Sequence, residues 1–297
     1  MPIVHPKHMT LNNQDQPVDA QTPQHRGFSV RGLPAFNDNY IWIVVATNGS
    51  GQGHGIAIVD PGDAAPVIDY CRRHGLVPDQ IWLTHHHADH TGGVAELRDW
   101  VGRQFAGHEL VVYGPAIEQI PGVTHLLDGD MHFSLGDMPL EVLSVPGHTR
   151  GHLAYLVGAP SEVPALFCGD TLFGLGCGRL FEGTALQMFK SLARIAALPP
   201  ETRIYCAHEY TLLNLPFALA VDPHNAELQA RAERIRQRCA LGEATVPLML
   251  SDELLTNPFL RSDQSALHEA AMLPAGASPL EVFTRLRQMR DTFKASH

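Results

Sequence analysis

Short runs of apolar residues, many of them β-branched or aromatic, recur along the first two thirds of the chain and predict strands. Most of the runs are bounded by Gly, Asn or Pro, residues that favour turns. The predicted strands are residues 28–33, 40–46, 55–59, 80–83, 110–113, 132–135, 140–145, 153–157, 165–168 and 203–206.

Helical spacing of apolar residues appears between these strands and then dominates the end of the chain. Within the mixed part the predicted helices are residues 64–74, which end at Gly75, 91–101 and 185–196. After about Tyr210 strand signals vanish, and the predicted helices are 212–220, 225–241 and 280–293. We therefore expect an α/β domain over residues 28–210 and an α-helical domain over 211–297. Residues 1–27 are polar and without period, which predicts a flexible tail.

Composition and charge narrow the possible partners. Hydrophobic residues make up 44% of the chain and charged residues 18%, as in an ordinary globular protein. The net charge of −10 argues against nucleic acid, which requires a basic surface. The longest apolar stretch, 40–46, is too short to span a bilayer, so no membrane partner is expected. Five cysteines, without a Cys-x-x-Cys pair, predict no disulfide framework and a cytoplasmic location.

Histidine, with 18 copies, clusters with aspartate at the end of one predicted strand. Directly after Leu83 the chain presents four candidate ligands, namely His85, His87, Asp89 and His90. Imidazole and carboxylate groups bind zinc, iron and manganese. Because the cysteines lie elsewhere, we expect an open site that keeps room for water, not a closed structural zinc site. The alternative is a solvated polar loop.

Three later strands also end near a residue that can bind metal. These residues are His148, Asp170 and His208. Alone, each of them is more often a structural group that makes hydrogen bonds. Together with the first cluster they supply seven ligands, too many for one tetrahedral ion but suited to two ions that share a carboxylate. Loops at strand ends on one side of a sheet can converge, which makes such a site feasible.

The segments that carry these ligands resemble the metallo-β-lactamase superfamily: residues 84–90, 146–149, 169–171 and 207–210. Further segments resemble, more narrowly, the glyoxalase II family, the hydroxyacylglutathione hydrolases. They are residues 37–40, 59–62, 169–173, 176–179, 181–183, 205–211 and 257–261. The resemblance extends from residue 28 to the end of the chain. It implies an α/β fold, an αββα sandwich followed by a helical domain that binds substrate.

The resemblance also assigns roles to the ligands. One metal would be held by His85, His87 and His148, and the other by Asp89, His90 and His208. Asp170 would bridge both, and with Asp89 it would be a catalytic residue. Asp60 would orient a ligand without binding metal, and His86 is interpreted as filling the loop. The implied cofactor is two divalent ions, zinc first, with iron and manganese as alternatives that accept the same ligands.

The implied activity is hydrolysis of S-D-lactoylglutathione to D-lactate and glutathione, a step of methylglyoxal detoxification. A hydroxide bridging the metals, from water whose pKa falls from ~15.7 towards ~7, would attack the thioester. Arg179, Tyr210 and Arg261 would bind the glutathione part. Two departures bear on its affinity: Phe181 replaces a tyrosine of some relatives, and a second cation after Arg261 is missing. A monomer is expected.

Other functions remain as alternatives. A glutathione persulfide dioxygenase shares the fold but uses one iron and generally lacks the helical domain. A β-lactamase must expel an amine nitrogen, and a nuclease of this superfamily requires a basic surface. A metal-binding module without catalysis predicts missing ligands, whereas this chain has the whole set. Cys177, in a Gly-Cys-Gly turn, is interpreted as a structural residue and not as a nucleophile.

Overall fold

A computed structural model describes residues 27–47, 53–158, 163–274 and 276–294 of the chain. The predicted tail, residues 1–27, lies outside the described residues except for Gly27. Among the described residues, no helix combines the length and the apolar character needed to cross a membrane.

The first half of the chain forms a mixed six-stranded sheet in the order β1-β2-β3-β4-β5-β6. Its strands are β1 (Phe28–Ala35), β2 (Asn39–Thr47), β3 (Gly53–Val59), β4 (Gln80–Trp82), β5 (Val111–Pro115) and β6 (His125–Leu127). The first three pair antiparallel and the rest parallel. Side chains of β2 alternate between the two faces: Trp42 and Val44 enter the core shared with the second sheet, and Ile41 and Ile43 face helices.

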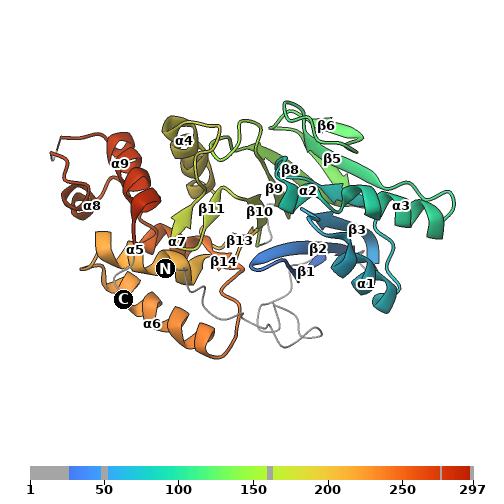
Figure 1. The fold of residues 1–297 in the computed structure, drawn as a ribbon, viewed down its shortest axis with the longest axis horizontal. Coiled ribbons are helices and arrows are strands. Elements are labelled where there is room, and N and C mark those ends of the chain that lie inside the picture. Colours follow the sequence, from blue (N-terminus) through green and yellow to red (C-terminus); the bar gives the residue numbers. More distant parts are fainter. Residues whose placement is uncertain (1–26, 48–52, 159–162, 275, 295–297) are drawn as a thin grey trace, which may run out of the picture.

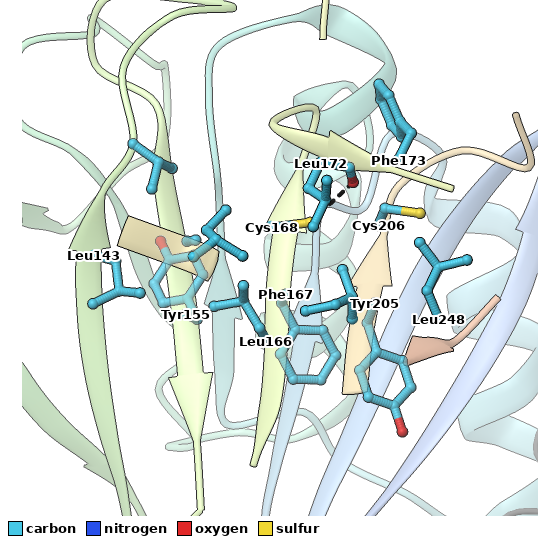
Figure 2. Close-up of a cluster of buried hydrophobic side chains, with 14 of the residues drawn as sticks. Leu143, Tyr155, Leu166, Phe167, Cys168, Leu172, Phe173, Tyr205, Cys206 and Leu248 are labelled. Atoms are coloured by element: carbon cyan, nitrogen blue, oxygen red, sulfur yellow. Dashed lines mark hydrogen bonds between the residues drawn. The ribbon is translucent and has the colours of Figure 1, made fainter. Parts of the chain in front are cut away.

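The second sheet also has six strands, in the order β14-β13-β10-β9-β8-β7. They are β7 (His132–Leu135), β8 (Met138–Ser144), β9 (Leu153–Val157), β10 (Ala165–Gly169), β13 (Arg203–Cys206) and β14 (Leu248–Met249). Figure 2 shows the apolar side chains that β9, β10 and β13 contribute to the core. Phe167 stacks on Tyr205 with ring centroids 5.0 Å apart. The hairpin of β11 (Leu172–Phe173) and β12 (Gly176–Cys177) follows β10.

Helices cover the outer faces of both sheets, which gives the expected αββα order (Figure 1). On the first sheet, α1 (Ala64–His74) and α3 (Val94–Gln104) pack Val67 and Leu97 against Ile58 and Ile81. On the side of the second sheet lie the remaining long helices. They are α4 (Ala185–Ala196), α5 (Thr211–Val221), α6 (Ala226–Ala240) and α9 (Pro279–Thr292), joined by the shorter α7 (Leu250–Thr256) and α8 (Ser265–Ala270).

Two sequence expectations about these elements are wrong. The helix predicted over 91–101 is interrupted: α2 (Ala88–Thr91) ends before Gly92 and Gly93, and α3 begins after them. A Cβ on Gly93 would lie 2.7 Å from the carbonyl oxygen of Pro61, so glycine permits this close backbone contact. Strands also do not end at Tyr210, because β14 pairs with β13 in the second sheet.

Candidate metal centre

The seven predicted ligands come together where four strands of the two sheets end. His85 and His87 follow β4, and Asp89 and His90 belong to the short helix α2. The other three ligands, His148, Asp170 and His208, follow β8, β10 and β13. The donor atoms form overlapping groups in which all atoms lie within 4.8 Å of one another: His85, His87 and His148; His85, His90 and Asp170; Asp89, His90 and His208.

One half of the centre consists of three imidazoles. Nδ1 of His87 lies 3.0 Å from Nε2 of His85 and 3.1 Å from Nε2 of His148. Nδ1 of His87 is therefore within hydrogen-bonding distance of both other ring nitrogens, and all three donor atoms lie within 4.8 Å of one another. A neutral imidazole has one N–H and one lone pair, so such a set suits a shared cation.

The other half combines Asp89 with two imidazoles. Oδ2 of Asp89 lies 3.5 Å from Nε2 of His90 and 3.5 Å from Nε2 of His208. Asn39 donates from Nδ2 to the same oxygen over 3.0 Å and fixes the carboxylate. This half contains a negative charge of its own, which the three imidazoles of the first half lack.

Asp170 lies between the halves, with one carboxylate oxygen towards each. Its Oδ1 is 3.5 Å from Nε2 of His90 and 3.4 Å from Nε2 of His208, and its Oδ2 is 3.4 Å from Nε2 of His148. This placement suits a carboxylate shared by two ions.

Two buried atoms at the centre have no hydrogen-bond partner among the described residues: Nε2 of His90 and Oδ1 of Asp170. Buried polar atoms without partners are rare because they lose hydration without compensation. Both atoms belong to side chains of a metal-ligand type and face other such side chains. The residues present therefore fit a divalent metal pair.

Contacts on the far side of the rings set their orientation. Nδ1 of His90 donates to Oδ2 of Asp60 over 3.0 Å, and Nδ1 of His208 donates to Oδ1 of Asp38 over 2.8 Å. Nδ1 of His148 donates to the carbonyl oxygen of Arg179 over 2.9 Å. Carboxylate or carbonyl partners of this kind fix the tautomer of a ligating histidine and direct its free nitrogen at the metal.

Burial and the mixture of charges shift the pKa values strongly. Burial alone would lower the pKa of His208, but Asp170 and Asp38 raise it to about 10. Burial and the neighbouring His90 hold the pKa of His85 well below its usual value. Burial opposes ionisation of Asp170, yet the surrounding imidazoles of His208 and His90 keep its pKa far below the usual range. Asp170 is thus an anion held among imidazoles.

Two buried residues that contact the predicted ligands or their sequence neighbours were not predicted from the sequence. His152 is buried, stacks on His85 with centroids 4.6 Å apart, and accepts the backbone N–H of Asp170 at Nε2 over 3.1 Å. Its only signal was its position four residues after His148. Glu118 follows β5 in a segment without a motif, and it accepts from His86 Nδ1 over 2.9 Å.

The interpretation of His86 as a loop filler is wrong. Its Nδ1 contacts Glu118, and its Nε2 lies 3.3 Å from Oε1 of Glu182. The three side chains form a fourth group with donor atoms within 4.8 Å. The ring of His86 thus contacts two carboxylates, one on each of its nitrogens.

The predicted substrate residues differ in their surroundings. Arg179 is exposed and lies 4.0 Å from Asp291. Tyr210 stacks on His208, with ring centroids 4.7 Å apart and planes at 7°. Burial, followed by nearby Asp38, raises the pKa of Tyr210, so the phenol keeps its proton.

Arg261 forms an ion pair with the buried Asp222, and the structure shows no contact between its side chain and the seven ligands among the described residues.

The turn that carries Arg179 packs directly on Asp170, one of the seven predicted ligands. A Cβ on Gly178 would lie 2.0 Å from the carbonyl oxygen of Asp170, so only glycine permits this approach. Cys177 is buried, and burial raises the pKa of its thiol. These features fit its interpretation as a structural residue.

Comparisons with known proteins agree with this geometry. Residues 39–208 match the model of the metallo-beta-lactamase superfamily, and residues 209–293 match the model of the hydroxyacylglutathione hydrolase C-terminus. Two solved structures share the fold at low sequence identity. ETHE1 from Myxococcus xanthus gives a TM-score of 0.59 at 20% identity over 90% of this chain and 92% of that one. A metallo-beta-lactamase from Staphylococcus aureus gives 0.57 at 21% identity over 92% and 75%.

Curated relatives are closer in sequence. The hydroxyacylglutathione hydrolase of Xanthomonas axonopodis pv. citri is 48% identical over 268 residues, 89% of this chain and 98% of the relative. That of Aliivibrio fischeri is 48% identical over 267 residues, 89% and 99%. The αββα sandwich is thus confirmed as a metallo-β-lactamase fold, and the matches span both the sandwich and the C-terminal helices. The chain belongs to the hydroxyacylglutathione hydrolase family of the metallo-β-lactamase superfamily.

Proposed function

We propose that this chain hydrolyses glutathione thioesters of 2-hydroxy acids, with S-D-lactoylglutathione as the substrate and D-lactate and glutathione as products. This reaction would serve methylglyoxal detoxification. The observation that carries the proposal is the gathering of all seven metal-type side chains at one edge of the sandwich, in a chain whose relatives over nearly their whole length are hydroxyacylglutathione hydrolases.

The side chains would hold two divalent ions, and we propose zinc, with iron and manganese as metals that the same ligands accept. His85, His87 and His148 would hold one ion, Asp89, His90 and His208 the other, and Asp170 would contact both. When bound, such a metal pair acts as a Lewis acid and lowers the pKa of water from ~15.7 towards ~7.

The protein contributes orientation and charge. Asp60, Asp38 and the carbonyl of Arg179 hold the rings of His90, His208 and His148 in place. The oxygen of water adds to the thioester carbonyl carbon and its protons pass to solvent, the C–S bond breaks to leave the carboxylate of the 2-hydroxy acid, and glutathione departs as a thiolate that takes a proton from solvent. Because a thiol has a pKa near ~8.5, the thiolate leaves without a dedicated proton donor.

Glutathione would be bound by residues beside the metal ligands. Arg179 is a mostly exposed cation that could meet a carboxylate with two parallel hydrogen bonds. The phenol of Tyr210 would donate to the cysteinyl part. Arg261 is already paired with Asp222, so it would bind a carboxylate of glutathione while it keeps this ion pair. In this scheme, residues 28–210 supply the metal centre and residues 211–297 complete the substrate site.

We also propose that the enzyme acts as a monomer in the cytoplasm. The cytoplasmic assignment is supported by the five cysteines, which all lie in described residues and have free thiols.

A direct assay tests the proposal. Zinc-loaded protein should consume S-D-lactoylglutathione and release free thiol and D-lactate in equal amounts. Failure of the metal-loaded protein to cleave this thioester would overturn the assignment. If the protein instead holds one iron and consumes oxygen with glutathione persulfide, the chain would be assigned to the dioxygenase class.

A further inference from the structure

Glu118 is a buried carboxylate outside the seven ligands, and its side chain joins three segments of the chain. It is 6% exposed. Its Oε1 accepts from Oγ1 of Thr149 over 2.5 Å and from the backbone N–H of Gly151 over 2.8 Å, and its Oε2 accepts from Nδ1 of His86 over 2.9 Å. Gly151 packs on the stem of Glu118, since a Cβ there would lie 2.6 Å from Cγ of Glu118.

Two of the residues that Glu118 contacts are sequence neighbours of the ligands proposed for the first metal. His86 lies between His85 and His87, and Thr149 follows His148. We propose that Glu118 is a positioning residue that holds the two loops bearing these ligands in register with each other. The inference rests on the proposed metal ligation. It assigns no metal contact to Glu118 itself.

The arrangement is asymmetric between the two halves of the centre. In the first half, Nδ1 of His85 and Nδ1 of His148 contact neutral oxygens, the hydroxyl of Thr84 at 3.0 Å and the carbonyl of Arg179 at 2.9 Å. The placement of these rings therefore depends more on the loops that carry them. His90 and His208 of the second half are held by Asp60 and Asp38 instead. Loss of Glu118 should therefore weaken one metal of the pair much more than the other.

Glu182 supports the same ring from the solvent side. Nε2 of His86 lies 3.3 Å from Oε1 of Glu182, and the backbone N–H of Glu182 donates to the carbonyl of His148 over 3.3 Å. The side chain of Glu182 is far more exposed than that of Glu118, so water competes for its contact. We expect Glu118 to supply most of the positioning.

Stepwise zinc dissociation constants, measured on the full chain by competition with a chromophoric chelator, test this inference. In Glu118→Gln the amide oxygen can still accept from Thr149 and Gly151, while the amide nitrogen faces His86. Glu118→Ala removes both carboxylate oxygens and therefore all three contacts. We expect one zinc to bind about 10-fold more weakly in the first variant and about 100-fold more weakly in the second. The other zinc should change less than about threefold.

Further variants identify the metal that is loosened. Asp38→Asn should weaken the other zinc, through His208, and the Glu118→Gln/Asp38→Asn double variant should show both losses, nearly additively. Glu141→Gln is the control for the same substitution elsewhere, because Glu141 is a half-buried glutamate on β8 that lies near Arg194. It should leave both constants unchanged. If Glu118→Ala does not fold, Thr149→Val removes only one donor, and the same zinc should weaken by a smaller factor.

The outcomes separate this inference from the proposed function. Wild-type protein that binds fewer than two zinc ions would contradict the proposed ligand set. Wild-type protein that binds two, with both constants unchanged or both equally weakened in the Glu118 variants, would overturn the positioning role alone.

Discussion

Nδ1 of His90 donates to Oδ2 of Asp60 over 3.0 Å, while Nε2 of the same ring is buried and has no partner among the described residues. Asp60 also accepts from the backbone and the hydroxyl of Thr84, both over 2.8 Å. With three donors directed at it, Asp60 is fixed as an acceptor. The ring of His90 must therefore present its other nitrogen to the candidate metal centre.

Asp60→Asn should weaken metal binding about 10- to 100-fold, because one acceptor oxygen becomes an amide donor that faces other donors. Asparagine suits the test because Asp60 has φ 50°, a left-handed conformation that Asn tolerates. Asp130→Asn is a matched control: φ is 55°, and the side chain is 67% exposed in an ion pair with Arg194. Equal zinc affinities in both variants, measured by chelator competition, would contradict the orienting role.

Arg179→Ala should raise KM for S-D-lactoylglutathione about 10-fold and leave kcat nearly unchanged. The reason is that a carboxylate contact remote from the thioester binds ground state and transition state alike. Arg234→Ala is a matched control, since Arg234 is 56% exposed and 3.9 Å from Asp252, whereas Arg179 is 64% exposed and 4.0 Å from Asp291. Steady-state kinetics measure both constants. A fall in kcat at constant KM would contradict a role of Arg179 in substrate binding.

Phe181→Tyr should lower KM about threefold to 10-fold, the effect of one added neutral hydrogen bond. Phe181 is 62% exposed, and its ring centroid lies 5.7 Å from that of His87 and 5.2 Å from that of His148. A para-hydroxyl group would therefore add a donor beside the metal centre. A KM that stays the same or rises would show that substrate does not reach this position.

Asn257→Ala should destabilise the protein by about 2–4 kcal/mol, because it leaves buried carbonyl groups without a donor. Nδ2 of Asn257 donates to the carbonyls of Phe173 and Gly176 over 3.1 and 3.0 Å, and the side chain is fully buried. These bonds tie the C-terminal helices to the hairpin that precedes Arg179. Urea denaturation measures the effect, and a loss below about 0.5 kcal/mol would contradict it.

The elements with local signals could be predicted from the sequence. Helix α1 was predicted with its observed bounds, because its apolar period and its end at Gly75, which has φ 65°, are both encoded locally. The interruption at Gly93 and the pairing of β14 depend on contacts with Pro61 and β13, distant in sequence. The two-residue strands β11, β12 and β14 are too short to show any alternation.

In the candidate site too, some residues could be predicted from local sequence signals and others could not. Its ligand types lie at strand ends in recognisable motifs, so the sequence predicted which side chains would gather. Glu118 was missed because it is 32 residues from His86 and belongs to no motif. The ion pair of Arg261 with Asp222 was equally hidden, since 39 residues separate the partners. Such partners follow only from the packed fold.

The central claim is that the gathered histidine and aspartate side chains hold a metal pair on which thioester hydrolysis depends. The most direct measurement follows metal content and hydrolysis of S-D-lactoylglutathione in the same sample during removal and return of zinc. We expect close to two metals per chain, loss of hydrolysis as a chelator removes them, and recovery when zinc returns. Undiminished hydrolysis by metal-free protein would contradict the account.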